Sequence, residues 1–390
     1  MPAPLSWSVP LSDLLVDDEL RAAVEETITS GWWSMGPRVE AFEQEFAAFC
    51  GARHAIALSS GTAALQLAVL AVGCGPADEV VVPSLTFVAA ANTVAHSGAT
   101  PVFCDIGGPG DLNLDPGDLD AACGPATKAI VVLHYGGFPC DMDAVNEIAQ
   151  RRGVAVIEDA AHAPGATWRG RACGTLGRVG CFSFFTNKNL PVGEGGMLVT
   201  DDDEIAAQVR LLRSHGMTSL TWDRHRGHAH AYDVVARGFN FRLDEVRAAI
   251  GLVQLRRLEA ANAARARIVA RYREGLGNVE GLTLPFGATP AHAVPAHHLA
   301  VAVLPPDVAR EDVRAALARR GIQTSVHYPP IHRFSAYADR SSRPLPMTDE
   351  VAGRLLTIPL YPHLEDEQVD SVVESLAAEV SRAGSGITLG

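Results

Sequence analysis

The feature that most constrains the fold is a repeated unit made of a short apolar run, a polar or glycine-containing turn and a helix. The runs are continuous rather than alternating, which is typical of strands buried on both faces of a sheet. They lie at residues 55–58, 80–82, 101–103, 129–133, 154–157, 181–184 and 197–200. Helices are expected between them, including 63–72 and 143–152. This order predicts an α/β fold in which helices cover both faces of a mostly parallel sheet.

Polar residues stand where several of these runs end. They are residues 59–62, Asp159 and Ser183. In an open parallel sheet, ligands bind beyond the carboxyl ends of the strands. We therefore expect these residues to share a ligand site at one edge of the sheet.

A long stretch rich in Ala, Leu and Arg divides the chain. Apolar residues recur at helical spacing from Leu243 onward, which predicts a helix at about 243–276. We expect a large ligand-binding domain at 1–250 and a smaller α+β domain at 251–390. Further elements are predicted as helices at 37–50, 310–320 and 366–382 and as a strand at 299–304.

Composition argues against several classes of protein. The net charge of −13 over 390 residues is unsuited to non-specific binding of nucleic acid. No apolar run is long enough to span a membrane, and the N-terminus does not resemble a signal peptide. The seven cysteines form no CxxC pair and are expected to be reduced core residues. These features predict a cytoplasmic protein without a membrane partner, and no metal site is predicted.

Lysine is rare in this chain. Of 32 basic residues only Lys128 and Lys188 are lysines, and Lys188 shortly precedes the glycine-rich residues 193–196. Arginine supplies the same surface charge, but lysine loses its proton far more easily and can then attack a carbonyl. Lys188 is therefore a candidate for imine chemistry, although a solvated surface lysine is the ordinary interpretation of a single lysine.

The segment Ser59-Ser60-Gly61-Thr62 precedes a predicted helix. The N–H groups of Gly61, Thr62 and Ala63 would then be unpaired and would form a cradle for a phosphate group. Serine and threonine are also common helix caps, so capping alone would explain this motif.

Asp159 and Phe87 suit a planar, electron-accepting cofactor. Asp159 follows a buried strand and could pair with a protonated ring nitrogen, or it could cap the next turn. Phe87 could cover the ring of a cofactor, or it could be an ordinary core residue.

The ordered combination of these motifs resembles the DegT/DnrJ/EryC1/StrS family of sugar aminotransferases, which depend on pyridoxal phosphate (PLP). The resemblance extends from about residue 11 to residue 377. The matching segments are 36–43, 59–65, 83–89, 98–103, 141–143, 157–162, 182–184, 188–190, 193–196, 238–244 and 326–330. It implies the aspartate-aminotransferase (type I PLP) fold.

The resemblance also implies catalytic roles. Lys188 would bind PLP covalently and then move a proton between the substrate carbon and the cofactor. Asp159 would keep the pyridine nitrogen protonated. His162, where the family has Gln or His, would lie near the ring, and Phe87 would stack on it.

The phosphate of PLP would be held from two subunits. Gly61, Thr62 and Ser183 would bind it within one chain. Asn240 would reach it from the other chain, which implies a homodimer with a shared active site.

The implied reaction moves an amino group from glutamate or glutamine to a keto sugar, such as a nucleotide-linked 4-keto sugar, in two half-reactions. This chemistry belongs to amino-sugar or antibiotic biosynthesis. One alternative acceptor is a cyclitol ketone (an inosose). A PLP-dependent sugar dehydratase is less well matched, because such relatives carry histidine where Lys188 stands. A regulator without turnover is a third alternative, against which the intact Lys188, Asp159 and Ser183 argue.

Two residues are candidates for substrate contact. Arg224 lies in a basic, histidine-rich loop at 222–230, which would suit the diphosphate of a nucleotide sugar. An exposed loop between domains is the alternative interpretation. His327, in the segment Val326-His327-Tyr328-Pro329-Pro330, is a candidate for sugar contact or a structural histidine beside a proline turn.

Overall fold

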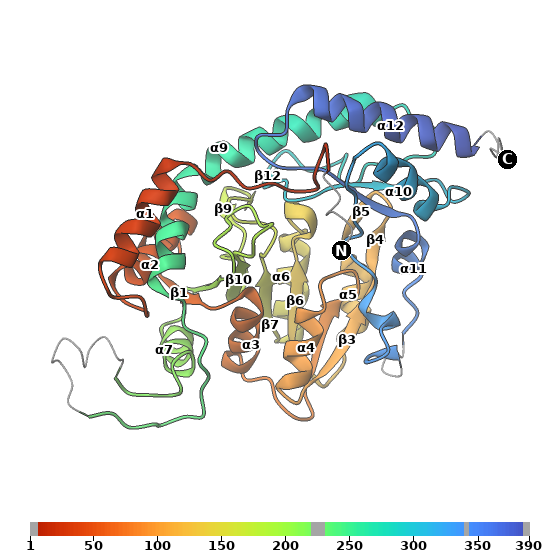
Figure 1. The fold of residues 1–390 in the computed structure, drawn as a ribbon. Helices are drawn as coiled ribbons and strands as arrows, with labels where there is room; N and C mark the ends of the chain where they lie inside the picture. The colour runs from red at the N-terminus through yellow and green to blue at the C-terminus, as the bar shows by residue number, and fades with distance from the viewer. Residues whose placement is uncertain (1–6, 220–230, 339–342, 385–390) are drawn as a thin grey trace.

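The computed structural model describes residues 7–219, 231–338 and 343–384. At its centre lies a seven-stranded sheet with the order β1-β11-β10-β7-β6-β2-β3 (Figure 1). The strands are β1 (His54–Leu58), β2 (Glu79–Pro83), β3 (Thr100–Cys104), β6 (Thr127–Leu133), β7 (Ala155–Asp159), β10 (Val179–Ser183) and β11 (Gly196–Thr200). Each of the seven predicted runs overlaps one of these strands, so the predicted sheet is confirmed.

One strand departs from the parallel arrangement. β11 pairs antiparallel with both β1 and β10. The neighbours β10–β7, β7–β6, β6–β2 and β2–β3 are all parallel. The sheet is therefore mostly parallel, as predicted.

Helices cover both faces of the sheet, because successive strand residues point to opposite sides. Ala55 and Ala57 of β1 belong to one core cluster, while Ile56 and Leu58 belong to the other. The first cluster includes residues of α2 (Pro37–Cys50), α5 (Pro116–Ala122), α6 (Met142–Arg152) and α9 (Glu245–Leu276). The second includes residues of α3 (Gly61–Ala71), α4 (Ala89–His96) and α7 (Asp203–Leu212).

The C-terminal part of the chain has its own small sheet and core. β13 (Ala300–Val303) pairs antiparallel with β14 (Leu355–Ile358). α10 (Arg310–Arg319), α12 (Asp366–Gly384) and the second half of α9 contribute to this core. The helices α9 and α12 run together along the top of Figure 1. The boundary predicted at residue 250 falls inside the 32-residue α9, and the division into domains stays a prediction.

The N-terminal segment lies against the C-terminal part. Val9 belongs to its core, and the backbone N–H of Gln323 donates to the carbonyl oxygen of Val9 at 2.9 Å. The remaining elements are α1 (Asp18–Thr29), β4 (Ile106–Gly108), β5 (Asp111–Leu114), β8 (Thr167–Trp168), β9 (Arg171–Ala172), β12 (Ala293–Val294), α11 (Pro346–Ala352) and the short 3-10 helices Tyr135–Gly137 and Ile331–Arg333.

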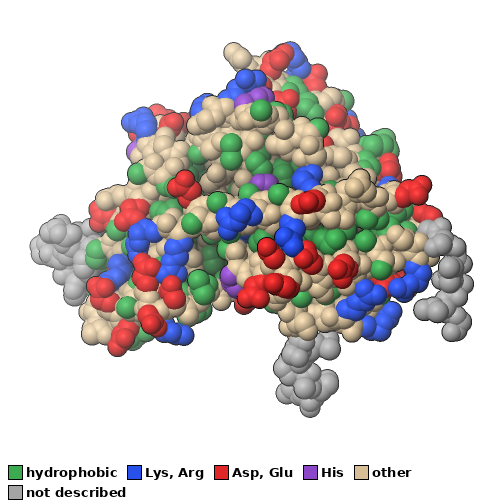
Figure 2. Space-filling model, turned by 90° about the horizontal axis from the view of Figure 1, so that it is seen from above, with side chains coloured by type: hydrophobic (Ala, Val, Ile, Leu, Met, Phe, Trp, Pro, Cys, Tyr) green, Lys and Arg blue, Asp and Glu red, His purple; other side chains and the backbone are tan. Residues whose placement is uncertain are grey.

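The surface and the cysteines are those of a globular protein. Seen from above, acidic and basic side chains are interspersed over the face shown in Figure 2. All seven cysteines are buried and unpaired, as the sequence predicted. Among the described helices, none has both the length and the apolar character needed to cross a bilayer.

Candidate active site

The polar residues predicted from the strand ends meet at one cavity of about 470 Å³. This volume is in the range of small-molecule sites. Eight of the residues predicted from the sequence line it, namely Gly61, Thr62, Phe87, Asp159, His162, Ser183, Lys188 and His327. They come from distant parts of the chain because the carboxyl ends of β7 and β10 and the start of α3 lie on the same side of the sheet.

The start of α3 leaves two backbone N–H groups for a ligand. Ser60 is the N-cap, and its Oγ accepts from the N–H of Ala63 at 3.0 Å. The expectation that the N–H of Ala63 is unpaired was therefore wrong, because the cap satisfies it. In the described part of the chain, no group accepts from the N–H of Gly61 or Thr62. Capping therefore leaves these two N–H groups free to bind an anion at this helix terminus.

Glycine is required at position 61 because α3 begins against the end of β10. A Cβ atom at Gly61 would lie 2.7 Å from the Cβ of Ser183. A Cβ at Gly196 of β11 would lie 2.4 Å from the carbonyl carbon of Ser60. These close approaches place the unpaired N–H groups of Gly61 and Thr62 beside Ser183. The two N–H groups and the hydroxyl of Ser183 can then bind the same phosphate group.

Asp159 presents a buried carboxylate at the end of β7. Its Oδ1 accepts from the N–H of Ala161 at 3.1 Å. Burial raises the pKa of this carboxyl, and the Ala161 hydrogen bond and the charge of Lys188 oppose that rise. A cationic group bound beside Asp159 would therefore be stabilised strongly.

The neighbouring Glu158 has a structural role on the other side of the strand. Its fully buried carboxylate accepts from the N–H groups of Gly174, Leu176 and Gly177. His134 Nε2 lies 2.9 Å from the same carboxylate. Of the two consecutive acids, only Asp159 lines the cavity.

Lys188 is half-buried at the cavity wall. Burial lowers the pKa of its amine to about 8, although the charge of Asp159 acts in the opposite direction. Its Nζ lies 3.4 Å from Nε2 of His298. A lysine in this environment has a substantial fraction of neutral, nucleophilic amine near neutral pH.

His162 is held as a neutral ring. Its Nδ1 accepts from the N–H of Gly136 at 3.2 Å, so the proton resides on Nε2, which lies 2.9 Å from the hydroxyl of Tyr328. Burial, reinforced by the nearby Lys188, keeps the pKa of His162 well below its usual value. The ring therefore contributes hydrogen bonding and packing rather than charge.

Another part of the cavity wall suits a planar ring. Phe87 is 55% exposed although it is a large apolar side chain, and its ring centroid lies 6.1 Å from that of Tyr328. The adjacent Thr86 has a buried Oγ1 for which the described part of the chain offers no hydrogen-bond partner. An uncovered ring and an unpaired hydroxyl in one cavity fit a bound aromatic cofactor that carries polar groups.

The donor set as a whole fits PLP. The N–H groups of Gly61 and Thr62 and the hydroxyl of Ser183 suit its phosphate. The amine of Lys188 suits its aldehyde carbon, and the carboxylate of Asp159 suits its ring nitrogen.

The residues predicted to contact the substrate or the second subunit differ from one another in their placement. His327 lines the cavity, with Nδ1 3.0 Å from Oγ1 of Thr357, and burial lowers its pKa to about 4. Asn240 is exposed and does not line the cavity of its own chain. Arg224 and the loop at 222–230 lie outside the described residues.

The sequence interpretation missed several cavity residues. Thr86, Asn187, Glu194 and Tyr328 line the cavity and lie within or beside the matched segments, so their positions were visible in the sequence. His298 contacts Lys188, yet it lies in the plain apolar segment that leads into β13. No local signal distinguished it from the neighbouring His297.

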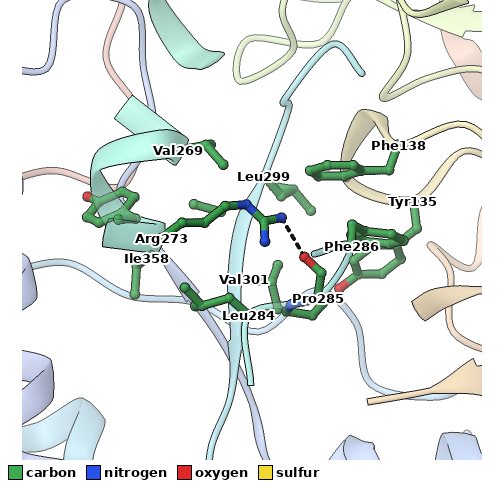
Figure 3. Close-up of a pocket in the computed structure, with 13 residues that line it drawn as sticks. Tyr135, Phe138, Val269, Arg273, Leu284, Pro285, Phe286, Leu299, Val301 and Ile358 are labelled. Atoms are coloured by element: carbon green, nitrogen blue, oxygen red, sulfur yellow. Dashed lines mark hydrogen bonds between the residues drawn. The ribbon is translucent and has the colours of Figure 1, made fainter. Parts of the chain in front are cut away.

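A second, smaller cavity lies between α9 and β13 (Figure 3). Arg273 points across it and donates a hydrogen bond from Nη2 to the carbonyl oxygen of Pro285 at 2.7 Å. The volume of this second cavity, about 30 Å³, suits a water molecule rather than a cofactor. It is therefore not the candidate active site.

Known proteins resemble this chain over nearly its whole length. Residues 15–377 match the sequence model of the DegT/DnrJ/EryC1/StrS aminotransferase family. The spore coat polysaccharide biosynthesis protein SpsC of Bacillus subtilis (strain 168) is 43% identical over 374 residues, which cover 94% of this chain and 96% of SpsC.

Solved structures agree with this match. The aminotransferase TlmJ from Streptoalloteichus hindustanus has a TM-score of 0.90 at 38% identity and covers 96% of this chain and 100% of TlmJ. DesV from S. venezuelae, solved in complex with a ketimine intermediate, has a TM-score of 0.85 at 38% identity and covers 93% of this chain and 95% of its own. The chain belongs to the DegT/DnrJ/EryC1/StrS aminotransferase family and is a PLP-dependent aminotransferase with the type I fold.

Proposed function

We propose that this chain binds PLP in the 470 Å³ cavity and transfers an amino group from glutamate or glutamine to a keto sugar. The observation that carries the proposal is the amine of Lys188, with a pKa of about 8, in the same cavity as the buried Asp159 and the two unpaired N–H groups of α3. A structural lysine would not need these neighbours.

In this proposal each residue has a defined task. PLP supplies an electron sink for the carbanion that forms when the amino-bearing carbon loses its proton. Asp159 keeps the ring nitrogen protonated, which makes that sink effective. Gly61, Thr62 and Ser183 anchor the phosphate, while Phe87 covers the ring.

Lys188 performs the proton transfer. Its neutral Nζ would accept the proton from the amino-bearing substrate carbon and would deliver it to the cofactor carbon on the other side of the nitrogen. A pKa of about 8 suits this two-way transfer, because the amine is neither fully protonated nor weakly basic near neutral pH.

The acceptor is proposed to be a keto sugar, and more specifically a nucleotide-linked 4-keto sugar. The role of SpsC in polysaccharide biosynthesis supports a sugar as acceptor. His327 is proposed to contact the sugar from the cavity wall, and Arg224 the diphosphate. Exchanging Arg224 for Gln should raise the KM for a nucleotide sugar, and an unchanged KM would remove Arg224 from the site.

The absorption spectrum tests the reaction. Purified protein supplied with PLP should show a near-visible band that bleaches when glutamate or glutamine is added. Lys188→Ala should abolish this band, and the matched control Lys128→Arg should keep it. A band that no amino donor changes would contradict the proposal.

A panel of acceptors identifies the substrate class. After bleaching, the band should return with the true acceptor, so 4-keto nucleotide sugars and inososes can be compared directly. Return with inososes alone would favour the cyclitol reaction. Release of water from the sugar, without transfer of nitrogen, would favour a dehydratase.

We further propose that the active unit is a homodimer in which Asn240 completes the phosphate site of the other chain. The exposure of Asn240 and its absence from its own cavity support this assignment. Co-expression of a Lys188→Ala chain with an Asn240→Ala chain tests it. The mixed dimer should regain activity, because one of its two sites would combine an intact Lys188 with an intact Asn240. If Asn240 serves its own chain, no site would be complete and no activity would return.

A further inference from the structure

A chain of hydrogen bonds leads from the protein interior to the amine of Lys188. Asn262 Nδ2 donates to the carbonyl oxygen of Pro164 at 2.9 Å. Asn189 Nδ2 donates to Oδ1 of Asn262 at 2.8 Å and to the carbonyl oxygen of Ala296 at 2.8 Å. Both Asn189 and the next residue in the chain of bonds, His298, are 5% exposed.

Two backbone carbonyl groups determine which atom donates and which accepts in each of these hydrogen bonds. A carbonyl oxygen only accepts, so the groups that face Pro164 and Ala296 must be amide nitrogens. The oxygen of Asn189 is then the atom 3.0 Å from Nδ1 of His298. Because this oxygen only accepts, Nδ1 of His298 must carry a proton. Nε2 of the neutral His298 ring is then an acceptor.

We propose that His298 is a positioning residue that holds Nζ of Lys188 by accepting one of its N–H groups on Nε2, 3.4 Å away. This role rests on the proposed function, in which Lys188 is the nucleophile and proton carrier. Because His298 accepts, the lone pair of the neutral amine is not used in this contact and stays available for reaction. The opposite tautomer would donate to that lone pair and block it.

Burial supports the neutral ring that this role needs. It keeps the pKa of His298 well below its usual value, and the positive charge of Lys188 adds to the effect. His162, whose ring lies 4.4 Å from that of His298, has the opposite proton position, with Nδ1 accepting from Gly136. Two adjacent histidines with opposite tautomers give a specific spectroscopic signature.

Nitrogen-15 NMR of the histidine rings in the cofactor-free enzyme tests the proposal. His298 should carry its proton on Nδ1, and His162 on Nε2. The signals of His298 are assigned by their loss in His298→Asn or, if that variant does not fold, in His298→Gln. In Lys188→Met, the Nε2 signal of His298 should shift because its hydrogen bond is lost. A proton on Nε2 of His298, or an Nε2 signal that Lys188→Met leaves unchanged, would overturn the proposal.

Kinetics of the complete enzyme give the second measurement. His298→Asn should lower kcat at least about 10-fold and leave the KM for the amino donor nearly unchanged, because a misplaced amine slows the chemical step. The matched control is His297→Asn, since His297 packs against Phe138 and, among the described residues, makes no hydrogen bond with Lys188. An equal loss of kcat in both variants would assign His298 a structural role only.

The two measurements separate this inference from the function on which it rests. If Lys188→Met abolishes transamination but the NMR signature is absent, Lys188 keeps its role and His298 loses its own. If the signature is present but Lys188→Met remains active, the proposed function fails instead.

Discussion

The titration of Lys188 is the most direct test of the active-site electrostatics. Burial lowers the pKa of its amine from 10.5 to about 8, against the opposing attraction of Asp159. The histidines that face it, His162, His298 and His327, all have pKa values lowered by burial, so they are neutral in this pH range. Asp159 is therefore the charged neighbour whose removal should move the titration.

The shift in the pKa of Lys188 determines how much of its amine is neutral near neutral pH. A change from 10.5 to about 8 corresponds to roughly 3 kcal/mol between the two protonation states. Near pH 7.5, about a quarter of the Lys188 amine is then neutral, compared with about one in a thousand for an ordinary lysine. The nucleophilic form is thus enriched by a factor on the order of 100.

Trace labelling of the cofactor-free enzyme measures this titration. Acetic anhydride reacts with neutral amines, and the chain has only two lysines, so mass spectrometry can follow each one separately. Labelling of Lys188 should rise with pH to a midpoint at about 8. Exposed Lys128 reports the concentration of reagent at each pH, and Lys128→Arg confirms the peptide assignment.

Removing Asp159 should move the midpoint in a defined direction. The carboxylate stabilises the ammonium form, so Asp159→Asn should lower the midpoint further. Glu194→Gln removes another carboxylate that lines the cavity but does not contribute to this shift, and it should leave the midpoint unchanged. A wild-type midpoint above about 10, the range of ordinary lysines, would refute the reasoning. A rise in Asp159→Asn would also refute it.

Substitutions at three further positions test the cofactor cradle and its cap. Gly61→Ala places a Cβ 2.7 Å from that of Ser183, and overpacking of about 1–3 kcal/mol should weaken PLP binding roughly 10-fold or more in a spectroscopic titration. Phe87→Leu should weaken PLP binding about 2- to 10-fold through lost ring stacking, while thermal denaturation of the cofactor-free enzyme stays unchanged because the ring is 55% exposed. Ser60→Ala should lower the free energy of unfolding by about 1 kcal/mol in denaturant, because the N–H of Ala63 loses its cap, and Ser60→Gly should cost only a few tenths. Equal effects of Ala and Gly at position 60, or unchanged PLP binding in the first two variants, would contradict these assignments.

The fold was largely predictable because strands buried on both faces leave a strong local pattern. Continuous apolar runs separated by helices indicate both the elements and their layering. The direction of β11 was not predictable in this way. An apolar run has the same pattern in a parallel and in an antiparallel pair, so its pairing with β1 and β10 depends on the path of the chain between strands.

The site was predictable where it follows from the strands. Asp159 and Ser183 end β7 and β10, and Gly61 begins α3, so a parallel sheet brings them together once the strands are located. Thr86 and Tyr328 lie within recognised motifs, but no local feature of the sequence indicated that they line the cavity. Ala63 was misjudged because the hydrogen bond from its N–H to the side chain of Ser60 depends on a rotamer.

The sequence by itself determined the chemistry that the sheet edge can offer: one lysine where arginine would serve for charge alone, a carboxylate at a strand end and a glycine at a helix start. Each of these features involves residues that are close together in the sequence, so the sequence pattern alone was enough to predict it. Only the tertiary structure decided how that chemistry is tuned. The burial that lowers the pKa of Lys188, the proton position on His298 and the contact between these two residues, 110 positions apart, depend on packing between distant segments. No periodicity within either segment encodes such contacts, because they arise only when segments far apart in the chain pack together.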